Sequence, residues 1–223
     1  MQTRYSSALI LGMMAVIAGL PAVAQADVDD AKRERVATPP QFHGPFYPTA
    51  LPRDTDNDLV IINETGTMAA GEIVHLSGQV VDINGEPVAN ALIELWQTDS
   101  SGVYLHHDSP HRSEYDRNFQ GFGRVLTGPS GEYYSRTIKP ASHVEKRSRR
   151  AAHFHIGVFV EDRSPLFTQV YFENQMFNDR DPILNSVSTP EQRQLLIVPL
   201  EIDPKSDELT ARFDVFMRFQ QDN

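Results

Sequence analysis

The feature that most constrains the fold is a series of short runs in which apolar and polar residues alternate, with turn residues between them. The run at residues 73–82 is followed by a turn at Ile83–Glu86, after which the next run begins. Further runs are PVANALIELW, GRVLTG, EYYSRTI, AHFHIGVFV, FTQVYF and ARFDVFMRF. This pattern is typical of strands in a β-sandwich or β-barrel. We therefore predict an all-β fold, an antiparallel β-sandwich with long irregular loops and one short helix that starts at Thr189.

The first 26 residues have the parts of an export signal. Arg4 gives a positive start, and Ala8–Leu20 form an apolar stretch that is too short to cross a membrane comfortably. Ala24 and Ala26, on either side of a glutamine, match a cleavage site. We expect cleavage after Ala26 and a mature protein in the periplasm or outside the cell, with no membrane segment.

Composition limits the ligands and partners that the chain can have. It has no cysteine, so disulfides and thiolate-bound metals are excluded, and any metal must be held by His, Tyr, Asp or Glu. The net charge is −10, and an acidic chain argues against a nucleic-acid partner. Residues 1–26 form the predicted signal, residues 27–40 predict a flexible N-terminal arm, and residues 41–223 predict one domain.

Two histidines one residue apart begin the run at residues 153–160. In a strand, His153 and His155 point to the same face while Phe154 points to the other. Two imidazoles on one face are half of a metal site, but ordinary histidines also occur on polar strand faces. The spacing alone leaves both interpretations open, and further ligands must come from elsewhere in the chain.

Five motifs follow one another along the chain. They are GPFYP (44–48), SGQVVDINGEPVANALIELWQTDSSGVY (77–104), DRNFQGFGRVLTGPSGEYYSRTIKP (116–140), RAAHFH (150–155) and TQVYF (168–172). In sequence and order they closely resemble the intradiol ring-cleavage dioxygenases, in particular the beta-type chains of protocatechuate 3,4-dioxygenase and exported proteins similar to them. The resemblance runs from about Gln41 to Phe219, which is nearly the whole mature chain.

The resemblance implies a β-sandwich with a prealbumin-like core whose edge loops hold a mononuclear non-haem Fe(III), bound by two tyrosinates and two histidines. The first tyrosine falls on Tyr104, and the histidines fall on His153 and His155. The family's arginine falls on Arg150, which would stabilise negative charge on the substrate ring, and a pocket glutamine falls on Gln169, which would orient the ring. The implied reaction is intradiol cleavage of a catechol-type substrate by O₂ to a cis,cis-muconate-type product.

The chain departs from the family at the second tyrosine. With no insertion or deletion after Tyr104, that position falls on His143. His143 is then a fourth ligand, or it points away and water fills the place, or the site holds another ion. Exchanging a phenolate for a neutral imidazole removes a negative charge and favours Fe(II), Cu(II) or Zn(II). We predict a metal centre of Tyr104, His143, His153 and His155.

A different class of function fits part of the sequence. Residues 77–95 also resemble the prealbumin-like modules of surface proteins, which would make the chain a non-catalytic binding module. The block at 116–140 and the histidine pair argue against this, because such modules need neither. The expected partners are a small catecholic substrate and O₂, and the resemblance is compatible with a homo-oligomer.

The basic run at 145–150 predicts either a solvated loop or a surface that attracts a carboxylated substrate. The remaining histidines are expected to be structural or exposed, with two of them, near Tyr104, as candidates for supporting the metal ligands. Those two are His106 and His107, and the others are His43, His75 and His111.

Overall fold

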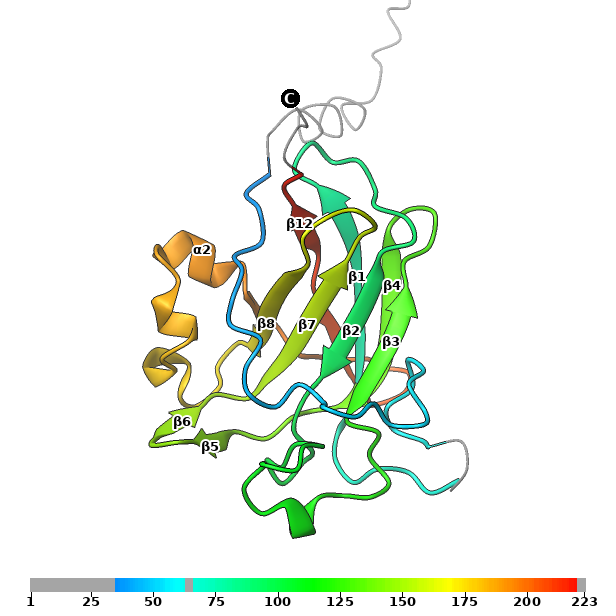
Figure 1. The fold of residues 1–223 in the computed structure, drawn as a ribbon, viewed down its shortest axis with the longest axis vertical. Coiled ribbons are helices and arrows are strands. Elements are labelled where there is room, and N and C mark those ends of the chain that lie inside the picture. Colours follow the sequence, from blue (N-terminus) through cyan, green and yellow to red (C-terminus); the bar gives the residue numbers. More distant parts are fainter. Residues whose placement is uncertain (1–34, 63–65, 220–223) are drawn as a thin grey trace, which may run out of the picture. The chain divides into compact units, whose positions relative to one another are not determined.

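The computed structural model describes residues 35–62 and 66–219 and folds them into two five-stranded β-sheets packed face to face (Figure 1). This confirms the predicted all-β sandwich. The predicted signal, residues 1–26, and most of the predicted arm lie outside the described residues. Within the described part of the chain, no helix is long and apolar enough to span a membrane.

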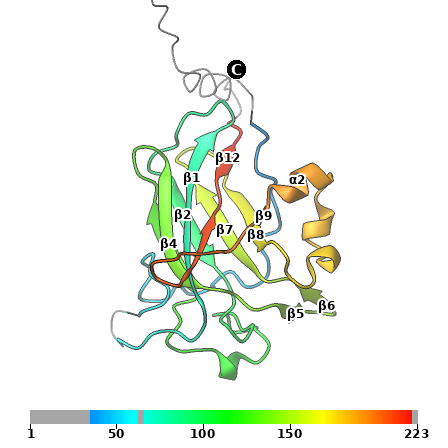
Figure 2. The ribbon, with the colours of Figure 1, turned by 180° about the vertical axis from the view of Figure 1, so that it is seen from behind.

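The first sheet has the strand order β10-β11-β1-β12, with β4 on the other edge of β1 (Figure 2). Its strands are β1 (Ile73–Asp82), β4 (Glu132–Ile138), β10 (Glu201–Ile202), β11 (Leu209–Arg212) and β12 (Val215–Met217). The second sheet has the order β3-β2-β7-β8-β9. Its strands are β2 (Leu92–Trp96), β3 (Phe122–Leu126), β7 (His153–Phe159), β8 (Leu166–Phe172) and β9 (Ile197–Val198).

Smaller elements lie outside the two sheets. They are the hairpin of β5 (His143–Glu145) and β6 (Ser148–Arg150), the 3₁₀ helices η1 (Arg112–Glu114), η2 (Asn178–Arg180) and η3 (Leu184–Ser186), and α2 (Pro190–Gln194). The predicted short helix is confirmed as α2. Its N-cap is Thr189, whose hydroxyl accepts a hydrogen bond from the Gln192 N–H.

The strand pairs are not all antiparallel. β1 runs parallel to β11 and β12, and β8 runs parallel to β9. Parallel neighbours need a long connection, and here β9, β11 and β12 all come from the segment that follows β8 and returns to both sheets. The sandwich is therefore mixed rather than purely antiparallel.

β1 changes partner at Gly78. Residues 74–77 pair with β11 and residues 80–82 pair with β12. Between them the backbone of Phe213 comes so close that a Cβ on Gly78 would lie 1.9 Å from the Phe213 carbonyl oxygen. This position accepts only glycine, because any side chain would push the two strands apart.

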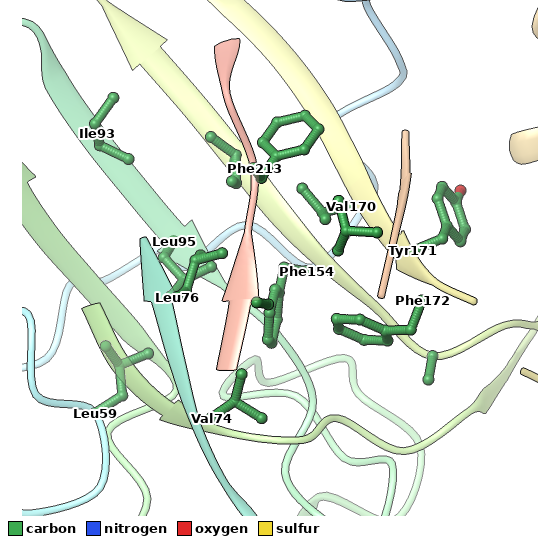
Figure 3. Packing of buried hydrophobic residues seen from close by; sticks show 14 of the residues in the cluster. Leu59, Val74, Leu76, Ile93, Leu95, Phe154, Val170, Tyr171, Phe172 and Phe213 are labelled. Carbon is green, nitrogen blue, oxygen red and sulfur yellow. The ribbon is translucent and has the colours of Figure 1, made fainter. Parts of the chain in front are cut away.

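The core lies between the two sheets (Figure 3). Alternate residues of β1, such as Val74 and Leu76, are buried there, as the period of two predicts. From the second sheet, Phe154 of β7 packs edge to face on Phe172 of β8, with 4.9 Å between the ring centroids. Every residue of β7 from His153 to Val158 is buried, so the face opposite Phe154 is covered as well.

The segment 38–41, where the predicted arm meets the predicted domain, is attached to both sheets. The Thr38 N–H donates to the Phe216 carbonyl at 2.9 Å, and the Gln41 N–H donates to the Phe167 carbonyl at 2.8 Å. In Figure 1 this segment, drawn in blue, runs beside β8. It leads directly to the GPFYP motif, which it brings to the edge of the second sheet.

Replacing Gly78 with alanine should destabilise the protein by about 3 kcal/mol, because the new Cβ overlaps backbone that cannot move independently. The measurement is the free energy of unfolding in urea. Gly66→Ala is the control, since a Cβ there meets nothing within 4 Å and only its positive φ of 63° is unfavourable. That change should cost about 1 kcal/mol. Equal losses for both variants would contradict the close approach at Gly78.

Candidate metal centre

Three potential metal-ligand atoms from two parts of the chain meet at one point. The Tyr104 hydroxyl oxygen lies 3.3 Å from His153 Nε2 and 3.0 Å from His155 Nε2, and the two Nε2 atoms are 3.1 Å apart. All three side chains are 2% exposed. Ligands that sit about 2.0–2.1 Å from a shared ion lie roughly 3 Å from one another, so the three atoms have the spacing of a metal-binding set.

The two histidines are held by the sheet. They lie on the same face of β7, opposite Phe154, and β2 pairs with β7 so that Trp96 is next to His155. The Trp96 ring stacks on the His155 ring with centroids 4.8 Å apart and planes 9° apart. On another side, Gly44 of the GPFYP motif has φ 80°, and a Cβ there would lie 3.0 Å from His155 Cε1. These contacts fix the plane of the His155 ring.

Tyr104 is positioned by a turn that a buried carboxylate organises. Asp99 is fully buried, and its Oδ1 accepts hydrogen bonds from the N–H groups of Ser101 and Val103. Its Oδ2 accepts from the Asp116 N–H, which joins the turn to the next loop. The turn places the Tyr104 hydroxyl next to the two histidines of β7. Burial raises the pKa of its phenol, and the positive charge of a nearby arginine opposes that shift.

The hydrogen bond of His153 determines which of its nitrogens can bind a metal. Its Nδ1 lies 2.6 Å from the Ala151 carbonyl oxygen, which only accepts, so Nδ1 carries the proton and Nε2 keeps its lone pair. Burial lowers the pKa of His153 and of His155 well below the ordinary value, and the charge of Arg150 adds to this. Both imidazoles are therefore neutral near pH 7, which is the form that binds metals.

His143 borders the same site. It begins β5 and is 7% exposed, and neither of its ring nitrogens has a hydrogen-bond partner among the described residues. Its ring centroid lies 5.1 Å from that of Tyr104 and 5.5 Å from that of His153. Burial, and then the charge of Arg150, lower its pKa to about 4. A neutral imidazole with two unused nitrogens thus stands beside the three converging atoms.

A pocket with a volume of about 640 Å³ opens onto this centre. Tyr104, His143 and Phe46 line it, and Phe46 also stacks on Tyr104 with 4.8 Å between centroids. Lys146 and Arg149, from the predicted basic run, are exposed at the same pocket. The pocket is therefore lined by apolar side chains together with two exposed cations and one carboxylate, that of Glu114.

Arg150 and Gln169 lie next to the histidines, and their side chains are hydrogen-bonded to each other. Arg150 Nη2 donates to Gln169 Oε1 at 2.5 Å and to the Tyr171 hydroxyl at 3.2 Å. Its Nε donates to Asp181 at 2.9 Å and its Nη1 donates to Glu145 at 3.3 Å. The guanidinium is thus buried in a network of protein acceptors. Its predicted contact with a substrate ring stays a prediction.

Asp181 is a site residue that the sequence reasoning missed. It is fully buried, and the same Oδ2 that accepts from Arg150 also accepts from the Ala151 N–H at 2.8 Å. Its Oδ1 accepts from the N–H groups of Ile183 and Leu184, both at 3.0 Å. Asp181 thereby fixes the residue whose carbonyl orients His153. Its local sequence does not signal this role, since Arg150 and Ala151 lie about 30 residues away along the chain.

The other histidines differ in their surroundings. His106 is 6% exposed and its ring faces Phe46 at 5.8 Å, whereas His107 is exposed. With Asp108 they form a group whose potential ligand atoms lie within 4.8 Å of one another. His75 lies on the other sheet, between Glu208 and a tyrosine hydroxyl. None of these residues contributes one of the atoms that converge at the Tyr104 hydroxyl.

Comparison with known proteins decides the family. A family model described as a dioxygenase matches residues 42–218 of this chain. The chain belongs to the intradiol ring-cleaving dioxygenases. It is 32% identical to the protocatechuate 3,4-dioxygenase beta chain of Burkholderia cepacia over 183 residues, which cover 79% of this chain and 77% of that one. It is 34% identical to the alpha chain from the same organism over 193 residues, with 81% and 92% covered.

Solved structures of other members have the same fold. The catechol 1,2-dioxygenase of Acinetobacter radioresistens aligns with a TM-score of 0.65 at 18% identity, covering 90% of this chain and 69% of that one. A dioxygenase domain from Streptomyces sp. SirexAA-E aligns with a TM-score of 0.62 at 23% identity, covering 83% and 100%. At these sequence identities, the structural similarity shows that this dioxygenase shares their fold.

The stability of the metal-free protein should fall as the pH is lowered from 7 towards 4. His143 protonates at about pH 4 when folded and at about 6.5 when unfolded, so the unfolded state binds more protons between these values. By pH 4 this group alone should cost on the order of 3 kcal/mol, since each pKa unit corresponds to about 1.4 kcal/mol. Urea unfolding of chelator-treated protein at several pH values measures the slope.

His143→Gln should flatten that slope, whereas His107→Gln, at an exposed histidine, should leave it unchanged. A wild-type stability that stays constant over this pH range would contradict the buried, neutral state of the three histidines.

Asp181→Asn should destabilise the protein by about 3 kcal/mol or more, because it leaves the buried Arg150 charge and the Ala151 N–H without their shared acceptor. Asp179→Asn is a matched control two residues away, where the carboxylate is 79% exposed and the change should cost less than about 0.5 kcal/mol. Thermal unfolding of both variants measures the difference. Similar melting temperatures for the two would show that Asp181 does not carry this network.

Proposed function

We propose that this protein cleaves the ring of a catechol-type aromatic between its two hydroxyl-bearing carbons, using O₂ and a mononuclear non-haem Fe(III), to give a cis,cis-muconate-type diacid. The observation that carries the proposal is the convergence of Tyr104 Oη, His153 Nε2 and His155 Nε2 at 3.0–3.3 Å. Membership of the dioxygenase family supports the reaction class.

The donor set suits a ferric ion. A phenolate is a hard, anionic donor that favours Fe(III), and imidazole binds iron well. When bound, such an ion would bind both catechol oxygens and withdraw electron density from the ring, which makes the ring reactive towards O₂. The residues that would hold it are Tyr104, His143, His153 and His155.

The burial of Tyr104 couples its ionisation to metal binding. Because burial raises the pKa of the phenol, the proton leaves only when a cation takes its place next to the oxygen. The two Nε2 atoms need no such change, since their histidines are already neutral. Trp96 and Phe46 cover the faces of two of the ligand rings and keep water away from them.

Arg150 and Gln169 would act on the substrate. The guanidinium is a fixed positive charge next to the ligands, and it would stabilise negative charge that develops on the bound ring. Gln169 pairs with His155 across β7 and β8, and its amide would orient the ring. Both side chains are already held by neighbours, so they would not need to reorganise during the reaction.

His143 is proposed as the fourth ligand. Neither nitrogen of this buried imidazole has a partner in residues 35–62 and 66–219, and a buried polar group is expected to be satisfied by a further ligand. With His143 the centre has three neutral ligands and one anionic ligand, one negative charge fewer than the two-tyrosine pattern. Compared with a two-tyrosine centre, this change weakens the preference for Fe(III) over Fe(II), Cu(II) or Zn(II), so the identity of the ion is the first quantity to measure.

Three further parts of the proposal concern the substrate, the assembly and the location of the protein. Lys146 and Arg149 at the mouth of the pocket favour a catechol with an anionic substituent. Relatives in Burkholderia cepacia are named as the alpha and beta chains of protocatechuate 3,4-dioxygenase, which supports assembly of this protein into an oligomer. The N-terminal export signal, which lies outside the described residues, supports a location in the periplasm or outside the cell.

Purified protein should contain about one iron per chain and should be red-brown, because tyrosinate bound to Fe(III) absorbs visible light. It should consume O₂ with catechols, and Tyr104→Phe should remove both the colour and the activity. Elemental analysis, the visible spectrum and an oxygen electrode measure these properties. A colourless, metal-free protein would favour a non-catalytic binding module, and copper or zinc would favour a different reaction.

His143→Ala should weaken metal binding by roughly tenfold or more, a loss that competition with a chelator measures directly. His107→Ala, at an exposed histidine, should bind metal like the wild type. His143→Tyr restores the family pattern: lost activity would mark the histidine as a working ligand, and a gain would mark it as a decayed one. Unchanged metal affinity in His143→Ala would remove His143 from the centre.

A further inference from the structure

Glu94 is a buried carboxylate that the proposed function does not use. It lies in β2 two residues before Trp96, so both side chains project from the same face of the strand. Ile93 and Leu95 project from the other face into the core. A charge on the outer face of a sheet is usually solvated, but Glu94 is only 2% exposed. Burying a charge is costly unless it is paired and hydrogen-bonded, so this position requires specific partners.

Two residues from different parts of the chain satisfy the carboxylate. Arg124 lies opposite Glu94 on β3, and its Nε and Nη2 donate to Oε1 at 2.8 and 2.6 Å. The Tyr47 hydroxyl donates to the other oxygen, Oε2, at 2.7 Å. The guanidinium thus fixes the plane of the carboxylate and leaves one oxygen for the tyrosine. Burial raises the pKa of the Tyr47 phenol, and Glu94 raises it further, so the phenol keeps the proton that it donates.

The segment 43–48, which contains the GPFYP motif, covers the rings of two predicted ligands. Its Gly44 lies against the His155 ring, and its Phe46 stacks on the Tyr104 ring. These contacts are mainly apolar packing, which attracts without fixing a direction. A directional contact is what can hold the segment in one position over the ligands.

The hydrogen bond from Tyr47 to Glu94 is such a contact. Within the part of the chain that the structure describes, it is the one side-chain hydrogen bond that involves the segment 43–48. The Tyr47 ring also packs edge to face on Trp96 with 5.2 Å between the centroids, and Trp96 stacks on the His155 ring. Glu94 is therefore connected to the ligands by two routes, through the segment that covers them and through the indole that touches one of them.

We propose that Glu94 is a positioning residue for the metal centre, which acts through Tyr47 to hold the segment 43–48 against the ligand rings. The inference rests on the proposed function, since it assumes that those rings bind an ion. Loss of the hydrogen bond leaves every ligand present but less well placed. Groups that orient metal ligands in this way are worth roughly ten- to a hundredfold in metal affinity.

Tyr47→Phe tests the proposal, because it removes the hydroxyl and keeps the ring. The affinity of chelator-treated, full-length protein for Zn²⁺, measured by competition with a chromogenic chelator, should fall about tenfold. Tyr133→Phe is the matched control, since that hydroxyl donates to the Phe213 carbonyl at 2.6 Å in the other sheet. Both variants leave a buried acceptor without its donor and should lose stability in urea. Only Tyr47→Phe should lose affinity for Zn²⁺.

Glu94→Gln shows whether the carboxylate acts through the tyrosine. This change removes the charge that both partners bind, so it should weaken Zn²⁺ binding at least as much as Tyr47→Phe does. The double variant should bind at most about threefold more weakly than Glu94→Gln alone, because residues that act as one unit do not give additive losses. A loss in the double variant equal to the product of the two single losses would overturn the proposal.

Chymotrypsin, which cuts after aromatic residues, gives a measurement on the metal-free protein. Phe46 is 8% exposed, so cleavage after it requires the segment 43–48 to open locally. This cleavage should be several-fold faster in Tyr47→Phe and unchanged in Tyr133→Phe. Wild-type cleavage or wild-type Zn²⁺ affinity in Tyr47→Phe, or an equal loss of affinity in Tyr133→Phe, would overturn the proposal.

Failure of the metal centre itself would give a different result. A wild type that binds no Zn²⁺, with cleavage after Phe46 still faster in Tyr47→Phe, would overturn the centre and leave Glu94 a structural role only.

Discussion

The candidate centre depends on the burial of both faces of β7. One face gives Phe154 to the core between the sheets, and the other turns His153 and His155 towards Tyr104. Because both faces are packed, neither imidazole can rotate away without opening a cavity, and close packing makes cavities costly. The same packing that stabilises the sandwich therefore holds two ligand atoms 3.1 Å apart before any ion is present. The centre is preorganised by the core rather than by its own hydrogen bonds.

Two buried carboxylates fix the backbone of the loops, as the hydrogen bonds of the sheet fix the strands. Asp99 accepts two backbone N–H groups from the turn before Tyr104 and one from the next loop. Asp181 accepts one from Ala151, just before His153, and two from the residues that follow Asp181 itself. A buried carboxylate is tolerated only when it is hydrogen-bonded in this way, so each one specifies a single backbone path. The irregular segments that bring the ligands together are therefore fixed by charge, whereas the strands are fixed by apolar burial.

The sequence was sufficient where the physical signal is local. The alternation in β1 predicts a strand with one buried face, and the pair at 153 and 155 predicts a shared face on β7. The cap at Thr189 predicts the start of α2. Gly78 and the parallel pairing of β1 with β11 and β12 were not predictable, because they depend on a chain segment more than 100 residues away.

The same division holds within the site. Phe46 lies in the GPFYP motif, which the sequence analysis identifies, and Tyr104 is identified through the family pattern. Asp181 and the stacking of Trp96 on His155 arise only when distant segments pack together. The environment of His143 is also a three-dimensional property. Its position in the sequence raises the question of a ligand, but only the fold shows that the ring is buried with no hydrogen-bond partner among the described residues.

The position of Trp96 has a practical consequence. It is the single tryptophan of the chain, and its indole lies flat against the imidazole of His155. All of the protein's indole emission therefore originates a few ångströms from the place where an ion would be held, and a paramagnetic or light-absorbing ion there would quench it. Indole emission would therefore report, without a label, whether such an ion is bound at the proposed centre.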